Sequence, residues 1–272
     1  MPTDTPHLLV ERDGPILTLT LNRPEARNAL SPEMLVRLAG AWREFRETKH
    51  LRVAILTGAG DVDFCAGGDL VRTMPLLTGA RQPEDEWDRR LMADLGQFTD
   101  AILRGFELYK PIVVAVNGNA LGGGTEMANA CDIRVASERA VFGTPEAKVG
   151  LLPGGGSISR LPRQIPWAKA MEMLLLGEPV SASEALAMGL VNHVVPPAEV
   201  MPTARRLAER LAANGPLAVQ KIKEGVVRGS GLTLAEALRI EDEVSAAVLS
   251  SRDAREGPRA FKEKRPPRFT GE

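Results

Sequence analysis

The sequence predicts an α/β fold, a spiral of strand-strand-helix turns over residues 1–195 that carries a C-terminal helical extension over residues 196–272. Three observations predict it. Short apolar runs typical of strands recur at 16–21, 53–58 and 111–118. Turns and helical patterns follow these runs, and two of the turns are rich in glycine. From about Ile158 onward the pattern is mainly helical.

The first unit shows this order most simply. In "ILTLTL" (16–21) apolar and polar residues alternate, which places the three leucines on one face, and "NRPEARNALS" then breaks the strand. Ser31 as N-cap and Pro32 at the first helical position predict the start of a helix. The apolar stripe of that helix comprises Met34, Leu35, Leu38, Trp42 and Phe45.

The second and third units repeat the order. "VAILTG" (53–58) indicates a buried strand, "AGDVDFCAGGD" a glycine-rich turn, and the segment from about 70 to 109 a polar helical stretch. "PIVVAVNG" (111–118) predicts a strand, "NALGGG" a turn and "TEMANACD" a helix. "IRVAS" and "AVFGTPE" then predict two more short strands.

The C-terminal part of the chain has clear helix signals. Ser181 and Glu184 form a capping-box pattern, and "VNHVV" predicts a last short strand. Capped, charged helices are then predicted over roughly 199–213, 216–228 and 233–250. Since no flexible linker precedes them, we expect the extension to pack on the body or on another subunit.

Composition excludes several classes of protein. The 272 residues are 44% hydrophobic and 25% charged, and 34 basic against 35 acidic residues give a formal net charge of -1. This balance favours neither nucleic acid nor an anionic membrane as a partner. No window reaches the ~18 apolar residues of a membrane span, so a cytoplasmic protein is expected. Cys65 and Cys131 are expected to be reduced, without metal-ligand spacing.

Two glycine turns follow buried strands, Ala66-Gly67-Gly68-Asp69 and Gly122-Gly123-Gly124. Such turns place backbone N–H groups at a helix N-terminus, where they favour negative charge. If the two turns converge, one N–H from each would form an oxyanion hole. The alternative is that the glycines only permit positive φ or tight packing.

Two glutamates accompany these turns. Glu126 follows the glycine triplet directly, and Glu146 follows Pro145 near another cluster at Gly154 to Gly156. Each has an ordinary interpretation, since Glu126 could simply satisfy the helix dipole and Glu146 could be a solvated loop charge.

Six segments together resemble the enoyl-CoA hydratase/isomerase, or crotonase, superfamily. They are "NRPEARNAL", "LTGAGDVDFCAGGDL", "KPIVVAVNGNALGGGTEMANACDIRVAS", "AVFGTPEAKVGLLPGGGSISRL", "ASEALAMGLVN" and "AFKEKRPPRF". The resemblance covers nearly the whole chain, is specific as a set, and is weakest between about 72 and 107. It implies a crotonase-like spiral of repeated ββα units.

The resemblance also implies catalytic roles. The amides of Gly68 and Gly123 would bind the thioester carbonyl of an acyl-CoA. Glu126 would activate water and Glu146 would exchange the Cα proton, and the two carboxyls would titrate as a coupled pair. The backbone of Gly154 would help to fix the water. Neither a metal nor a redox cofactor is implied, because coenzyme A is part of the substrate.

Substrate binding and assembly are implied in the same way. The acyl-CoA would contact the loop from Ala66 through Gly68, Asp69, Leu70 and Val71, together with Arg27, Gly123 and Gly154. Phe261 and Lys264 match a C-terminal pair that reaches the CoA of a neighbouring subunit, although Lys264 could equally be a solvated charge. A homotrimer or a dimer of trimers is therefore expected.

Three functions remain open at this stage. The first is an enoyl-CoA hydratase, because both carboxylates stand at the hydratase positions. The second is an enoyl-CoA isomerase or another enolate-forming acyl-CoA lyase of the same fold, with Glu146 as the main proton shuttle. The third is a CoA-binding protein of low activity. The sequence does not specify the acyl group.

Overall fold

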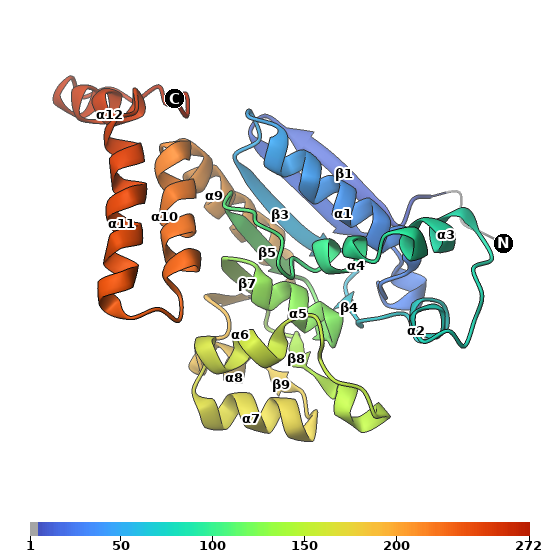
Figure 1. Cartoon of the computed structure of the whole chain (residues 1–272). Coiled ribbons are helices and arrows are strands. Elements are labelled where there is room, and N and C mark those ends of the chain that lie inside the picture. Colours follow the sequence, from blue (N-terminus) through green and yellow to red (C-terminus); the bar gives the residue numbers. More distant parts are fainter. Residues whose placement is uncertain (1–4) are drawn as a thin grey trace.

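Two sheets built by successive turns of the chain form the body of the computed structural model, which describes residues 5–272 (Figure 1). The strands are β1 (Leu8–Asp13), β2 (Ile16–Leu21), β3 (Val53–Gly58), β4 (Asp63–Cys65), β5 (Ile112–Val116), β6 (Asn119–Leu121), β7 (Ile133–Ser137), β8 (Val141–Gly143), β9 (Val180–Ser181) and β10 (His193–Val195). One sheet has the order β1-β2-β3-β5-β7-β10 and the other β4-β6-β8-β9. β1 and β2 both belong to the larger sheet, whereas the later pairs β3-β4, β5-β6 and β7-β8 each add one strand to each sheet, so the predicted spiral of ββα units is confirmed.

Helices cover the sheets and form the C-terminal part. They are α1 (Pro32–Glu47), α2 (Thr73–Leu77), α3 (Glu86–Ala93), α4 (Gly96–Ala101), α5 (Gly123–Ala130), α6 (Ser157–Gln164), α7 (Trp167–Leu176), α8 (Ala182–Ala187), α9 (Val200–Ala213), α10 (Pro216–Gly229), α11 (Leu234–Leu249) and α12 (Asp253–Lys262). Short 3-10 helices span η1 (Pro24–Ala26), η2 (Pro145–Val149) and η3 (Pro197–Glu199). The predicted N-cap at Ser31, the capping box at Ser181 and the helices α9 to α11 are confirmed.

The central strands are buried on both faces, as expected for parallel strands covered from two sides. In β3, Ala54 and Leu56 belong to the core beneath α1. Val53 and Ile55 point to the other face, where α9 packs through alanines such as Ala204 and contributes a second apolar cluster. This double cover holds the ends of the strands in fixed positions.

Several sequence predictions were wrong in detail. The segment from about 70 to 109 is not one helical stretch, because α2, α3 and α4 are short and separated by turns. β4 and β6 lie inside the two segments predicted as turns, and each has only three residues. Strands this short, flanked by Gly, Asp and Asn, give no alternation pattern to detect. β1, which pairs antiparallel with β2, was also missed.

The helices after residue 195 fall into two groups. α9 covers the sheet, whereas α10 and α11 form a hairpin that stands beside the body in Figure 1, with α12 crossing its end. Lys223 on α10 joins the hairpin to the body through the Asp132 carboxylate at 2.7 Å and the Lys110 carbonyl at 3.1 Å. Within residues 5–272, no helix is both long and apolar enough to cross a membrane.

Candidate active site

Three neighbouring strands of the smaller sheet end at the same edge of that sheet. β4 pairs in parallel with β6, and β6 pairs in parallel with β8. Because the carboxyl ends of parallel strands lie together, the segments that follow them meet. The turn at Gly68 follows β4, Gly122 to Gly124 follow β6, and Glu146 follows β8.

The glycine triplet has a structural requirement at two of its positions. Gly122 has φ 53° and ψ -123°, a conformation essentially restricted to glycine. A Cβ on Gly124 would lie 2.3 Å from the carbonyl oxygen of Cys65, so a side chain there would force α5 away from β4. The glycines thus bring the first turn of α5 close to the turn after β4.

The two turns predicted to supply the oxyanion hole are adjacent. A Cβ built on Gly123 would lie 3.7 Å from the amide nitrogen of Gly68. The bridge between Leu30 and this turn uses the carbonyl of Gly67 and the amide of Asp69, and does not use the Gly68 amide. Gly123 is the first residue of α5, where the backbone N–H has no acceptor within its helix.

Glu126 is held in a nearly closed environment on the first turn of α5. Glu126 is only 5% exposed. Its Oε1 accepts a hydrogen bond of 3.2 Å from the amide of Ser157, the first residue of α6. Burial raises the pKa of Glu126, while the backbone N–H groups of Ser157 and Gly155 and the charge of Arg160 oppose that rise.

Glu146 has a different environment. Its Oε1 lies beside Gly122, where a Cβ would approach it to 3.1 Å. Its Oε2 is buried and has no hydrogen-bond partner among residues 5–272. Burial, with a smaller contribution from the nearby Glu126 charge, raises the pKa of Glu146 to about 7.

One cavity of about 630 Å³ contains both carboxyls and both glycine turns. Of the residues predicted to bind or act, those in its wall are Ala66, Gly68, Leu70, Gly123, Glu126, Glu146 and Gly154. Its apolar wall includes residues that sequence reasoning missed, namely Leu30, Met74, Leu77, Phe98 and Ile102. Because the segment from about 70 to 109 was predicted only as a polar helical stretch, no pattern in it directed the side chains of α2 and α4 to the site.

Three other predicted contacts lie outside the cavity wall. The Arg27 guanidinium pairs with both carboxylate oxygens of Asp63, at 2.8 and 3.0 Å. The Asp69 carboxylate is buried, pairs with Arg23 at 2.9 Å and accepts from the amides of Val71 and Arg72. It therefore shapes the loop after Gly68. Val71 itself is 78% exposed and is not among the lining residues.

The predicted C-terminal pair is also separate from the cavity of its own chain. Phe261 on α12 is 88% exposed, and Lys264 follows in a left-handed conformation with φ 52°. Neither lines the cavity that holds Glu126 and Glu146.

Cys65, at the end of β4, is fully buried, and burial raises the pKa of its thiol to about 12. It is a packed side chain, because a thiol with this pKa is not a nucleophile near neutral pH. In the part of the chain that the structure describes, no group of three or more His, Cys, Asp or Glu side chains is arranged to hold a metal ion.

Comparisons with known proteins all point to one family. The family model for enoyl-CoA hydratase/isomerase matches residues 11–272. Enoyl-CoA hydratase EchA19 of Mycobacterium tuberculosis is 44% identical, covering 97% of this chain and 96% of the relative. (E)-benzylidenesuccinyl-CoA hydratase of Thauera aromatica is 41% identical, covering 96% and 98%. The crystal structure of enoyl-CoA hydratase from Bacillus anthracis has a TM-score of 0.88 at 36% identity, covering 98% of this chain and 100% of that one.

Proposed function

The chain belongs to the enoyl-CoA hydratase/isomerase family, and from this premise we propose that it is an enoyl-CoA hydratase that adds water syn across the 2,3 double bond of an enoyl-CoA thioester. The observation that carries the proposal is that Glu126 and Glu146 line one cavity together with Gly68 and Gly123. The hydratase names of the relatives from M. tuberculosis and T. aromatica support it.

The backbone amides of Gly68 and Gly123 would hold the thioester oxygen. Attack of water at Cβ moves electron density through Cα to this oxygen, and the resulting enolate needs fixed donors. Each donor lies on a turn that the sheet fixes in place. Each such donor is worth about 10² to 10³ in rate where one has been removed from other enzymes.

The two glutamates divide the proton transfers. The Glu126 carboxylate takes a proton from water while the water oxygen bonds to Cβ, and the protonated Glu146 gives its proton to Cα. Glu126 ends protonated and Glu146 ionised, so the pair returns to its starting state by exchange with solvent. The environments fit this division, because Ser157 donates to Glu126, whereas the pKa of Glu146 is raised to about 7.

The apolar cavity wall supports an acyl group of substantial size. Leu77, Phe98 and Ile102 lie on α2, α4 and the residue after α4, where they face the catalytic carboxyls. Coenzyme A would enter along the exposed apolar residues Leu70 and Leu152 at the mouth. The substrates that the relatives' names specify differ, so they assign no acyl group to this protein.

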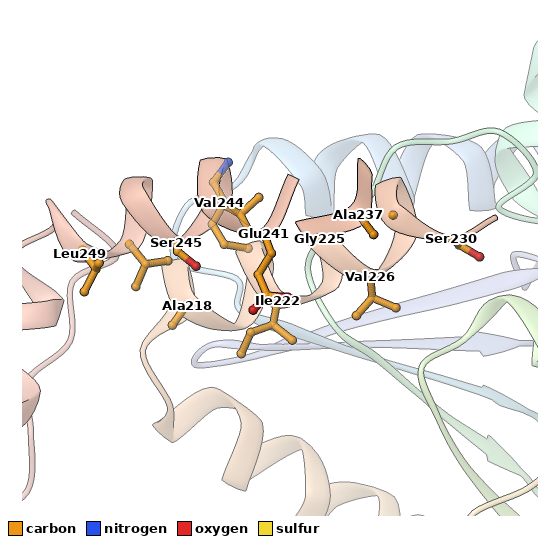
Figure 2. Close-up of a pocket in the computed structure, with 13 residues that line it drawn as sticks. Ala218, Ile222, Gly225, Val226, Ser230, Ala237, Glu241, Val244, Ser245 and Leu249 are labelled. Carbon is orange, nitrogen blue, oxygen red and sulfur yellow. The ribbon is translucent and has the colours of Figure 1, made fainter. Parts of the chain in front are cut away.

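A homotrimer, or a dimer of trimers, would complete the site. The groove between α10 and α11 is mostly apolar, and Figure 2 shows Ile222, Val226 and Leu249 among the side chains that line it. Ile222 and Val226 are 67% and 69% exposed in the single chain. Apolar surface of this kind is typical of protein interfaces. Assembly through the hairpin would bring Phe261 and Lys264 toward a neighbouring subunit's CoA, and sedimentation equilibrium tests it, since a mass of one subunit would contradict the proposal.

The test of function is the absorbance of a panel of enoyl-CoA esters of increasing chain length, beginning with crotonyl-CoA. Hydration removes the conjugated double bond, so the absorbance of the conjugated thioester is expected to fall. No loss with any ester would contradict the hydratase proposal and favour a CoA-binding protein of low activity.

Double-bond isomerisation is the second candidate, because one observation favours it. The Oε1 of Glu146 lies beside the turn of Gly122, and its buried Oε2 has no partner among residues 5–272, which suits a single proton shuttle. A 3-enoyl-CoA ester separates the candidates, since isomerisation creates the conjugated absorbance that hydration removes.

A further inference from the structure

Arg160 lies behind the catalytic cavity, on the first turns of α6, and sequence reasoning did not select it. Its guanidinium does not line the cavity that contains Glu126 and Glu146, but lines a separate cavity on the other side of the glycine turn at residues 154–156. A cation near the N-terminus of a helix opposes the helix dipole. Other contacts must therefore offset the unfavourable interaction between Arg160 and the dipole of α6.

Those contacts are two carbonyl groups from distant parts of the chain. Arg160 Nη2 donates to the carbonyl of Leu103 at 2.5 Å, and Nη1 donates to the carbonyl of Gly155 at 3.2 Å. No carboxylate forms a salt bridge with Arg160 in residues 5–272. Leu103 has φ 56°, a left-handed conformation that is costly for a leucine. The hydrogen bond from the Arg160 guanidinium to the Leu103 carbonyl stabilises this conformation.

The same glycine turn supports the catalytic base. A Cβ on Gly155 would lie 2.4 Å from Glu126 Oε2 and 2.9 Å from the side chain of Ile102. Gly155 is thus packed directly against the Glu126 carboxylate on one side, and its carbonyl is held by Arg160. Two residues later, the amide of Ser157 donates to Glu126 Oε1.

The guanidinium also occupies the space that a side chain at Gly156 would need. A Cβ there would lie 2.5 Å from Arg160 Nη1. The guanidinium therefore packs directly on the turn. It connects the turn to Leu103, whose neighbour Ile102 forms part of the acyl wall.

We propose that Arg160 is a positioning residue for hydration, which fixes the glycine turn beneath Glu126 relative to the acyl wall at Ile102 and supplies a positive charge behind that carboxylate. This inference rests on the proposed hydratase function. The charged groups that face Glu126 from the surrounding elements are Glu146 on η2 and Arg160 on α6, while Arg104 after α4 and Lys148 on η2 line the same cavity.

The test compares Arg160→Met and Arg160→Lys with Arg163→Met as the matched control. Arg163 stands on the same helix, is exposed and donates to the carbonyl of Ser159 within that helix. Hydration of crotonyl-CoA gives kcat and KM for each variant. The pKa of Glu126 is measured separately by ¹³C NMR of glutamate-labelled protein, with Glu126→Gln to assign the signal.

For Arg160→Met we expect kcat to fall about 10²-fold with KM unchanged, because a displaced base loses rate more than substrate affinity. The pKa of Glu126 should rise, since the positive charge behind it is gone. Arg160→Lys should keep the wild-type pKa of Glu126 but lose part of kcat, because an ammonium cannot hold two carbonyls in a planar fork. Arg163→Met should match the wild type.

Wild-type kcat and an unchanged pKa of Glu126 in Arg160→Met would overturn the inference, as would an equal loss in Arg163→Met. If Arg160→Met does not fold, Arg160→Lys decides, and wild-type kcat in that variant would overturn it. If the wild type hydrates no enoyl-CoA, the proposed function fails. The NMR titration then still tests the charge behind Glu126 on its own.

Discussion

Glu126 and Glu146 are chemically identical groups in one cavity, yet their surroundings differ. Glu126 accepts a backbone hydrogen bond from Ser157, and Arg160 lies behind it. Glu146 has one buried oxygen without a partner in residues 5–272, and burial raises its pKa to about 7. Hydrogen-bond donors favour an ionised carboxylate, whereas burial of an oxygen that has no donor favours a protonated acid. This difference supports the proposed roles, with Glu126 as the base and Glu146 as the acid, although burial raises the pKa of both.

The largest expected effect comes from removing each carboxyl. Glu126→Gln and Glu146→Gln should each lower hydration of enoyl-CoA by about 10² to 10⁴-fold, because an amide preserves shape but cannot exchange the proton. CoA affinity, measured by calorimetry, should remain close to that of the wild type. Comparable turnover in either variant would contradict the paired roles.

A second reaction separates the two glutamates. If Glu146 alone handles the Cα proton, Glu126→Gln should still exchange the Cα hydrogens of butyryl-CoA with deuterium from D₂O, and Glu146→Gln should not. Proton NMR of the saturated ester follows this exchange without any addition of water. Equal loss in both variants would mean that the division of roles is wrong.

The next effect concerns the proposed oxyanion hole. Gly123→Pro removes one backbone N–H and should lower kcat by about 10² to 10³-fold. Gly123→Ala is the matched control, because it adds a Cβ but keeps the N–H. The added atom would lie 3.0 Å from the end of the Leu30 side chain, 3.5 Å from Gly67 Cα and 3.7 Å from the Gly68 amide nitrogen. If Gly123→Ala is as slow as Gly123→Pro, the loss of kcat comes from steric crowding and not from the missing N–H.

The pH dependence of kcat/KM should report the raised pKa of Glu146. Its proton is lost as the pH rises through about 7, so kcat/KM should fall on the alkaline side of that value. On the acidic side, kcat/KM should fall as Glu126 becomes protonated. Because the two carboxyls interact, the pKa values read from the acidic and alkaline sides of the profile describe the pair and not either residue alone. A profile that stays level well above neutral pH would contradict a protonated Glu146.

The smallest expected effect is on stability. The folded-state pKa of Glu146 lies above its ordinary value of 4.5, so the unfolded chain releases this proton first and wild-type stability should decline between about pH 4.5 and 7. Glu146→Gln lacks this loss. Above pH 8 the variant should be more stable by on the order of 1 kcal/mol after solvent screening, measured by thermal unfolding. This difference in stability between Glu146→Gln and the wild type should shrink at pH 4. A difference that does not change with pH would contradict ionisation of the buried Glu146 as its cause.

The sequence predicted the parts of the fold that carry long apolar patterns or caps. The stripe of α1, the run in β3 and the capping box at Ser181 were all readable. The smaller sheet was not, because β4 and β6 have three residues each and leave no periodicity. That sheet is nevertheless what aligns the turns of Gly68 and Gly123.

The residues of the candidate site could be predicted from the sequence, but their different surroundings could not. The motifs selected Glu126 and Glu146, whereas only the folded chain shows that Glu126 accepts from the amide of Ser157 and that Glu146 Oε2 has no partner among residues 5–272. Arg160 had one local signal, a cation early in a helix, where the dipole disfavours it. Its two carbonyl partners are 5 and 57 positions away in the sequence, and no short pattern records the more distant contact.

The most direct measurement is a crystal structure of the protein with an unreactive enoyl-CoA analogue bound. The thioester oxygen should lie about 3 Å from the amide nitrogens of both Gly68 and Gly123. The carboxyls of Glu126 and Glu146 should stand over the Cα–Cβ bond. A thioester bound away from these two amides, or a double bond within reach of only one carboxyl, would contradict the account.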